Sequence, residues 1–89
     1  MLIILLIKWI TYRIYFKNIM EKIYIKDDFI KLGQALKLSG VAGSGVDAKY
    51  LIEDGLVAVN GETELRRGRK LYKGDSFSFE EREFEIDGL

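Results

Sequence analysis

Two spacings of apolar residues, every second position and every third or fourth, follow one another along the chain. Isoleucines at alternate positions predict a short strand over residues 21–26, because every second side chain of a strand shares one face. Apolar residues then recur at the spacing of one helix face, so we expect a helix over residues 30–39. Asp27-Asp28 is expected to begin this helix, and Gly40 to end it, because glycine readily adopts the left-handed conformation of a helix stop.

A second helix is expected between Ser44 and Gly55. Ser44 is a preferred N-cap residue, and Asp47 places an acid in the first turn, where the helix dipole favours negative charge. Leu51 and Ile52 contribute to one apolar face, and Gly55 ends the helix. Both predicted helices are therefore short, and a glycine-containing loop joins them.

Strand spacing returns in the last third of the chain. The β-branched run at residues 56–59 leads into Asn60-Gly61, which favours a tight hairpin because both residues tolerate positive φ. The return strand is expected to begin at Leu65, and two closing strands to flank residues 81–82. The order β-α-α-β-β-β predicts an α+β fold with two short helices packed on a small, mainly antiparallel sheet. The expected core includes Leu51, Ile52, Phe77, Phe79 and Phe84.

Residues 1–19 differ in composition from the rest of the chain. They are predominantly apolar or aromatic, and their only charges are three cations. Their uninterrupted apolar run covers residues 1–7, whereas a membrane-spanning helix needs about 20 apolar residues and a secretory signal has its cations before the apolar run. Either they are an extension upstream of a true start at Met20, or they add a strand or helix to the domain; a weak membrane anchor is the third alternative. Residues 20–89 are expected to form one domain.

The composition excludes most catalytic and metal chemistry. The chain contains no His and no Cys, so it has no disulfide, thiolate nucleophile, imidazole base or Cys/His zinc site. The acid pairs Glu53-Asp54 and Glu80-Glu81 are adjacent in sequence, and adjacent side chains point apart on a helix or strand. We therefore expect no enzymatic activity, no cofactor and no metal.

The net charge of zero, from 14 basic and 14 acidic residues, conceals an uneven distribution. Without the three cations of residues 1–19, 11 basic residues remain against 14 acids. Between residues 66 and 73 five cations occur with no acid, whereas residues 75–87 carry six acids and a single arginine. The chain therefore has a basic stripe followed by an acidic C-terminal segment.

Two features of this pattern suit a polyanion. The planar guanidinium of arginine matches phosphate geometry, and solvated surface charge is the alternative for the stripe at residues 66–70. Ser44, Gly45 and the free amides of the second helix predict an N-terminal anion site, with Lys49 one turn farther on. Tyr50 and Tyr72 can stack on bases, with half-buried packing as the alternative.

These residues resemble a known RNA-binding domain, that of ribosomal small-subunit protein S-four, also called the αL motif. The resemblance covers residues 29–79 and is carried by the segments LGQALKL (32–38), GLVAVNG (55–61) and RRGRKL (66–71), by Ser44-Gly45 with Ala48-Lys49, and by Gly74-Asp75. It is greatest to small stand-alone bacterial members. The resemblance implies binding of structured RNA, commonly ribosomal or transfer RNA, through the helix pair and the following basic loop. Asp47 departs from what a polyanion site would favour.

We therefore expect a cytoplasmic, monomeric, non-enzymatic protein that binds ribosomal or transfer RNA and associates with the ribosome. The alternative is a protein-interaction module that uses the sheet and the acidic segment to attach to a ribosomal protein or an RNA-processing enzyme. A membrane partner depends wholly on residues 1–19 and is not expected. The residues expected to contact RNA are Lys37, Ser44, Gly45, Lys49, Arg66, Arg67, Arg69 and Lys70.

Overall fold

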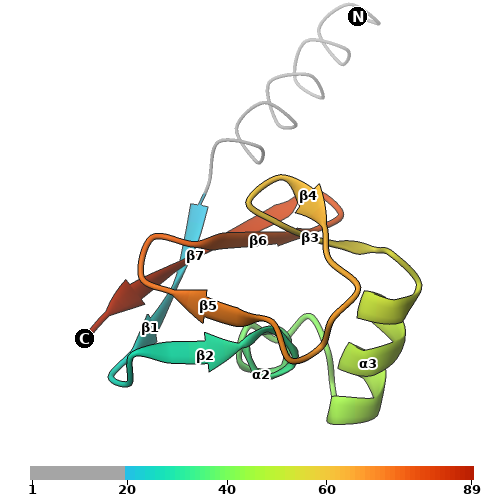
Figure 1. Cartoon of the computed structure of the whole chain (residues 1–89), viewed down its shortest axis with the longest axis horizontal. Coiled ribbons are helices and arrows are strands. Elements are labelled where there is room, and N and C mark those ends of the chain that lie inside the picture. Colours follow the sequence, from blue (N-terminus) through green and yellow to red (C-terminus); the bar gives the residue numbers. More distant parts are fainter. Residues whose placement is uncertain (1–19) are drawn as a thin grey trace, which may run out of the picture.

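The computed structural model describes residues 20–89, and the alternatives for residues 1–19 lie outside these described residues. The described part contains seven strands and two helices (Figure 1). Among residues 20–89 no helix has the length and apolar character needed to cross a membrane. In chain order the elements are β1 (Met20–Ile25), β2 (Phe29–Lys31), α2 (Leu32–Leu38), α3 (Gly45–Glu53), β3 (Val57–Val59), β4 (Glu62–Thr63), β5 (Lys70–Tyr72), β6 (Ser76–Phe79) and β7 (Arg82–Gly88).

The strands form two sheets. Five of them pair in the order β1-β7-β6-β3-β4, and every pairing is antiparallel except the parallel pair β1-β7. The other two, β2 and β5, form a separate antiparallel ribbon next to α2. Figure 1 shows the two helices together at one end of the larger sheet, with the ribbon beside them. The predicted α+β fold with two helices and a mainly antiparallel sheet is confirmed.

The core lies between the helices and the larger sheet. Phe77 and Phe84 face each other across β6 and β7, with ring centroids 4.8 Å apart and planes 13° from parallel. Both rings and the Ile52 side chain are buried, as expected from the sequence. Leu51 and Phe79 are partly buried and pack against the same cluster.

The first helix is shorter than the apolar spacing predicted. It begins at Leu32 because the three preceding residues form β2 and pair with β5, so a start at residue 30 was wrong. Asp27 and Asp28 lie in the bend before β2 and not at the helix start. The N-cap residue is Lys31, whose side chain makes no capping hydrogen bond.

The second helix agrees with its predicted signals. The backbone N–H of Asp47 donates to Ser44 Oγ at 3.1 Å, which is an N-cap contact. Gly40 and Gly55 adopt φ of +83° and +76°, so both predicted helix stops are confirmed.

The hairpin after β3 forms where it was predicted, but its second strand differs. Asn60 and Gly61 have φ of 51° and 85°, as the tight turn requires. The return strand β4 follows the turn directly and ends at Thr63, so the expectation that Leu65 begins it was wrong. Leu65 is exposed, because the chain leaves the sheet there and crosses toward α2 before entering β5.

Candidate functional site

The segment between β4 and β5, residues 64–69, is called the basic loop below. Its backbone carbonyls accept hydrogen bonds from the first turn of α2: Leu32 N donates to Arg69 O at 2.8 Å, and Gly33 N donates to Arg67 O at 3.0 Å. The first amides of a helix have no partner within the helix, and Lys31 provides no side-chain cap. The basic loop therefore supplies the missing acceptors, and it is held at the N-terminal end of α2.

Glu64 holds the basic loop from within. Its side chain is 9% exposed, and it accepts hydrogen bonds from the backbone amides of Leu65 and Arg66 at 3.1 and 3.2 Å. The Arg66 guanidinium donates to both of its oxygens at 3.0 Å, and Arg69 Nη1 donates to Oε1 at 2.7 Å. Hydrogen bonding to Arg66 first, and to Arg69 in addition, lowers the pKa of the Glu64 carboxyl from 4.5 to about 2. The carboxylate is thus ionised, and both of its oxygens accept hydrogen bonds.

In the folded protein an acid therefore lies beside the basic stripe. Glu64 lies two residues before the counted stripe, and its charge is opposed by two arginines, so the cluster of Glu64, Arg66 and Arg69 has a net charge of +1. Arg67 and Lys70 alternate with these arginines along the chain. Within residues 20–89 neither Arg67 nor Lys70 has a carboxylate at ion-pair distance.

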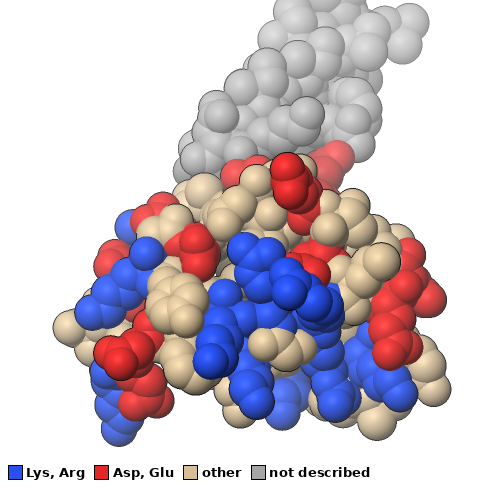
Figure 2. All heavy atoms as spheres, viewed as in Figure 1, with Lys and Arg blue, Asp and Glu red and all other residues tan. Residues whose placement is uncertain are grey.

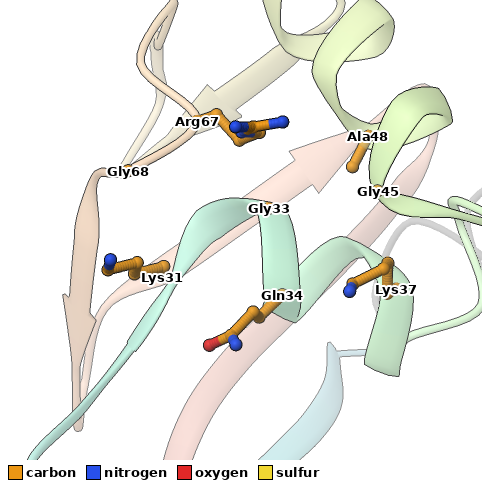
Figure 3. A pocket seen from close by; sticks show the side chains of 8 residues that line it. All are labelled: Lys31, Gly33, Gln34, Lys37, Gly45, Ala48, Arg67 and Gly68. Atoms are coloured by element: carbon orange, nitrogen blue, oxygen red, sulfur yellow. The ribbon is translucent and has the colours of Figure 1, made fainter.

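Arg67 turns away from Glu64 and covers Gly33. A Cβ placed on Gly33 would lie 2.7 Å from Arg67 Cγ, so only a glycine leaves room for this side chain. Figure 3 shows Arg67 reaching from the basic loop across the start of α2 toward α3. Arg67 forms one wall of a hollow of about 340 Å³, called the cationic groove below. The groove is lined by Lys31, Gly33, Gln34, Lys37, Gly45, Ala48, Arg67 and Gly68.

The cationic groove brings together three of the residues predicted from the sequence: Lys37, Gly45 and Arg67. It also includes Lys31, which the sequence reasoning missed because this lysine lies outside the basic stripe. Its signal in the sequence is its place just before the first helix. Three cations from three segments thus border a hollow in which Gly45 and Gly68 leave backbone uncovered, which is an arrangement suited to an anion.

The N-terminus of α3 contributes no charged side chain to the groove, only Gly45 and the methyl group of Ala48 (Figure 3). Gly45 lines it, whereas Ser44 uses its hydroxyl to cap its own helix. Lys49 is exposed on α3 and does not line the groove. Asp47 is exposed in the same first turn, where its charge opposes an incoming anion.

Lys70 lies on the ribbon next to the groove. In the pairing of β2 with β5 it stands directly opposite Lys31, and Phe29 stands opposite Tyr72. Figure 2 shows Lys and Arg side chains gathered across the middle of the face that carries β5 and the basic loop, with acids mainly around them. The structure therefore gathers cations on this face.

The cations on the strands of the larger sheet form ion pairs with acids. Lys22 Nζ lies 3.4 Å from both Glu85 and Asp87, and Arg82 Nη2 lies 2.9 Å from Glu21. Within residues 20–89 no three His, Cys, Asp or Glu side chains come together as a metal site. The sheet and the groove are thus electrostatically different regions.

The described part of the chain is similar in sequence to known proteins. Residues 23–87 match the family model described as the S4 domain. Over 58 residues the chain is 48% identical to "Probable ribosome maturation protein RlbA" of Bacillus subtilis (strain 168), a match that covers 65% of this chain and 82% of the relative. Over 54 residues it is 39% identical to YbcJ of Escherichia coli (strain K12), named as a candidate RNA-binding protein, covering 61% of this chain and 77% of the relative.

Proposed function

The chain belongs to the S4 domain family, and from this premise we propose that it is a non-enzymatic, cytoplasmic protein that binds structured RNA, ribosomal or transfer, in association with the ribosome. The names of two relatives, one a ribosome maturation protein and the other an RNA-binding protein, support this proposal. The observation that carries it is the cationic groove. Its cations Lys31, Lys37 and Arg67 have no ion-pairing carboxylate within residues 20–89.

The groove is suited to one stretch of phosphate backbone. The Arg67 guanidinium can present two parallel N–H groups to one phosphate, and Lys31 and Lys37 flank it as point charges. At Gly45 and Gly68 nothing lies within 4 Å of the place where a Cβ would stand, so the RNA backbone can approach the protein closely there. Contacts of this kind position a nucleic acid and do not read its sequence.

The other predicted contacts take secondary places in this proposal. Lys70 and Lys49 extend the positive surface beyond the groove. Arg66 and Arg69 act mainly through the shape of the basic loop, because Glu64 already occupies their guanidinium groups. Ser44 and Gly45 contribute backbone at the α3 terminus.

The test is RNA affinity as a function of salt, measured with ribosomal RNA fragments and transfer RNA. The logarithm of the association constant should fall with the logarithm of salt concentration by about 0.7–0.9 per neutralised phosphate. The double variant Arg67→Glu/Lys37→Glu should lose about 100-fold in affinity at moderate salt, because two phosphate contacts become repulsive.

The matched control is Lys26→Glu/Lys73→Glu, which makes the same charge change at exposed positions outside the groove. This control should stay within about threefold of the native affinity, because distant surface charges are screened. Equal losses in both double variants would reject the groove as the site. Association with ribosomes that survives nuclease treatment and high salt would favour the protein-interaction module instead.

A further inference from the structure

The outer side of the ribbon carries two aromatic rings and two lysines. Ile30 and Leu71 point into the protein, and Leu71 is completely buried. The alternate positions point outward, and there Phe29 is 36% exposed and Tyr72 is 49% exposed. The ribbon therefore exposes rings that a three-residue strand pair has no need to expose.

The two rings and one lysine touch each other. The centroids of Phe29 and Tyr72 are 5.9 Å apart with planes inclined at 52°, and Lys70 Nζ lies 4.7 Å from the centre of the Phe29 ring. Lys70 thus covers Phe29, which leaves Tyr72 as the more accessible ring.

Tyr72 borders a second hollow on the basic loop. This hollow of about 560 Å³ is lined by Arg66, Gly68, Arg69, Lys70 and Tyr72. Gly68 also lines the cationic groove, so the two hollows meet at this glycine. An occupant of the groove that continues past Gly68 arrives beside the Tyr72 ring.

The ribbon also holds two like charges face to face. Lys31 and Lys70 are direct partners in the register of β2 and β5, and like charges in that position destabilise a strand pair. Within residues 20–89 neither lysine has a carboxylate partner. No acid of the described residues relieves this repulsion, and a bound anion would do so.

Tyr72 is held at a fixed backbone position. Its N–H donates to Asp75 Oδ2 at 2.7 Å, and its carbonyl accepts from Asp75 N at 2.9 Å. A ring on a fixed backbone with two side-chain torsions loses little entropy when a ligand stacks on it.

We propose that the Tyr72 ring, supported by Phe29, stacks on an unpaired base of the bound RNA. This inference rests on the proposed function: the phosphates beside that base occupy the cationic groove, and the chain continues past Gly68 into the second hollow. Bases stack on tyrosine rings and on arginine guanidinium planes, and the second hollow presents both. Every charged residue that lines the two hollows is a cation, which matches a nucleotide. The RNA class is therefore one in which a single-stranded nucleotide adjoins a structured element.

The test compares full-length protein with Tyr72→Ala and with the matched control Tyr72→Phe, which keeps the ring. Two probes of equal phosphate number are used, a short oligouridylate and a blunt RNA duplex. Tyr72→Ala should weaken binding of the oligouridylate about tenfold, because one base–aromatic stack is lost. Tyr72→Phe should bind both probes within about twofold of the native protein, and no variant should alter duplex binding. Thermal unfolding of each variant checks that the fold is intact.

The outcomes separate this inference from the proposed function. If native protein binds both probes and Tyr72→Ala leaves oligouridylate affinity unchanged, the stacking site is rejected while the proposed function stands. Equal losses for both probes also reject it. If native protein binds neither probe, nor ribosomal or transfer RNA, the proposed function fails first. Tyr72-dependent binding of polyglutamate in place of oligouridylate would reject a base in favour of an acidic protein partner.

Discussion

Arg66 and Arg69 contrast with Arg67 and Lys70, although all four lie within five consecutive residues. The first two turn to one side and donate to Glu64. The other two turn away, one over Gly33 into the cationic groove and one over the Phe29 ring. The comparison shows that a run of cations in a sequence overstates the charge available to a ligand, because some of that charge stabilises the loop.

This division has a physical reason. The basic loop has no regular ladder of hydrogen bonds after β4 ends at Thr63, yet its carbonyls must meet the first amides of α2. A buried carboxylate with five nitrogen donors from the loop holds that shape: two backbone amides, two guanidinium nitrogens of Arg66 and one of Arg69. Burying Glu64 would be costly without these partners.

The strongest test of the comparison removes Glu64. Glu64→Ala leaves the half-buried Arg69 guanidinium and two loop amides without an acceptor, while the exposed Arg66 turns to water, so we expect the free energy of unfolding to fall by about 3 kcal/mol. The control is Glu62→Ala, an exposed acid on β4 two residues earlier, which should change stability by less than about 0.5 kcal/mol. Urea unfolding measures both. Equal effects would show that Glu64 has no special role in the loop.

Acid should act on the same cluster. The pKa of Glu64 is about 2 in the folded protein against 4.5 for the ordinary carboxyl. The stability that this group contributes is therefore complete above pH 4.5 and is lost as the pH falls toward 2, and we expect about 2 kcal/mol once solvent screening at exposed Arg66 is allowed for. Melting of native protein and Glu64→Gln across this range measures the difference.

The comparison with Glu64→Gln isolates one carboxyl among several. The pKa values of Glu21 and Asp87 are also lowered, the first by its hydrogen bond to Arg82 and the second by the Gly88 amide. Native protein and Glu64→Gln both retain Glu21 and Asp87, so the pH dependence of these two groups cancels in the difference in stability. A constant difference in stability between native protein and Glu64→Gln over the whole range would contradict the assigned ionisation.

Single arginine truncations separate the two sides of the loop. Arg67→Ala should lower RNA affinity about fivefold and reduce the salt slope by about one, with little change in stability. Arg66→Ala should do the reverse, lowering the free energy of unfolding while RNA affinity stays within about twofold. Salt titrations and urea unfolding of the same preparations provide both readings. If Arg66→Ala lowered RNA affinity and Arg67→Ala lowered stability, the roles assigned to the two arginines would be reversed.

The smallest effect is expected from Gly33→Ala. The new Cβ would meet Arg67 Cγ at 2.7 Å, so the arginine must move out of the groove, and RNA affinity should fall about threefold. The control places Gly33→Ala in the Arg67→Ala background, where no Cγ opposes the new Cβ, so no further loss of affinity is expected. An equal loss from Gly33→Ala in both backgrounds would show that its effect does not depend on Arg67.

Several features could be read from the sequence because they depend on near neighbours. The cap at Ser44, the stops at Gly40 and Gly55, and the turn at Asn60-Gly61 all formed where predicted. Each is governed by the conformational preference of one residue or by a contact three residues away. The same holds for the core spacing of the helices and closing strands.

The ribbon of β2 and β5 was missed for the opposite reason. Each strand is only three residues long, and the partners Phe29 and Tyr72 are far apart in the chain. Strands this short carry too few residues for an alternating pattern, and pairing over such a separation depends on the packed domain. The error at the first helix start follows directly, because β2 occupies residues 29–31.

The two helices with their stops, the tight turn after β3 and the absence of imidazole and thiol chemistry follow from the amino-acid sequence alone, because they depend on residue type and near neighbours. Which cations remain available to a ligand does not follow from the sequence. Glu64 forms ion pairs with Arg66 and Arg69, while Lys31, Lys37 and Arg67 come from three segments and line one hollow. Only the tertiary structure decides this, because ion pairing depends on distance in space, and chain neighbours such as Arg66 and Arg67 can point in opposite directions.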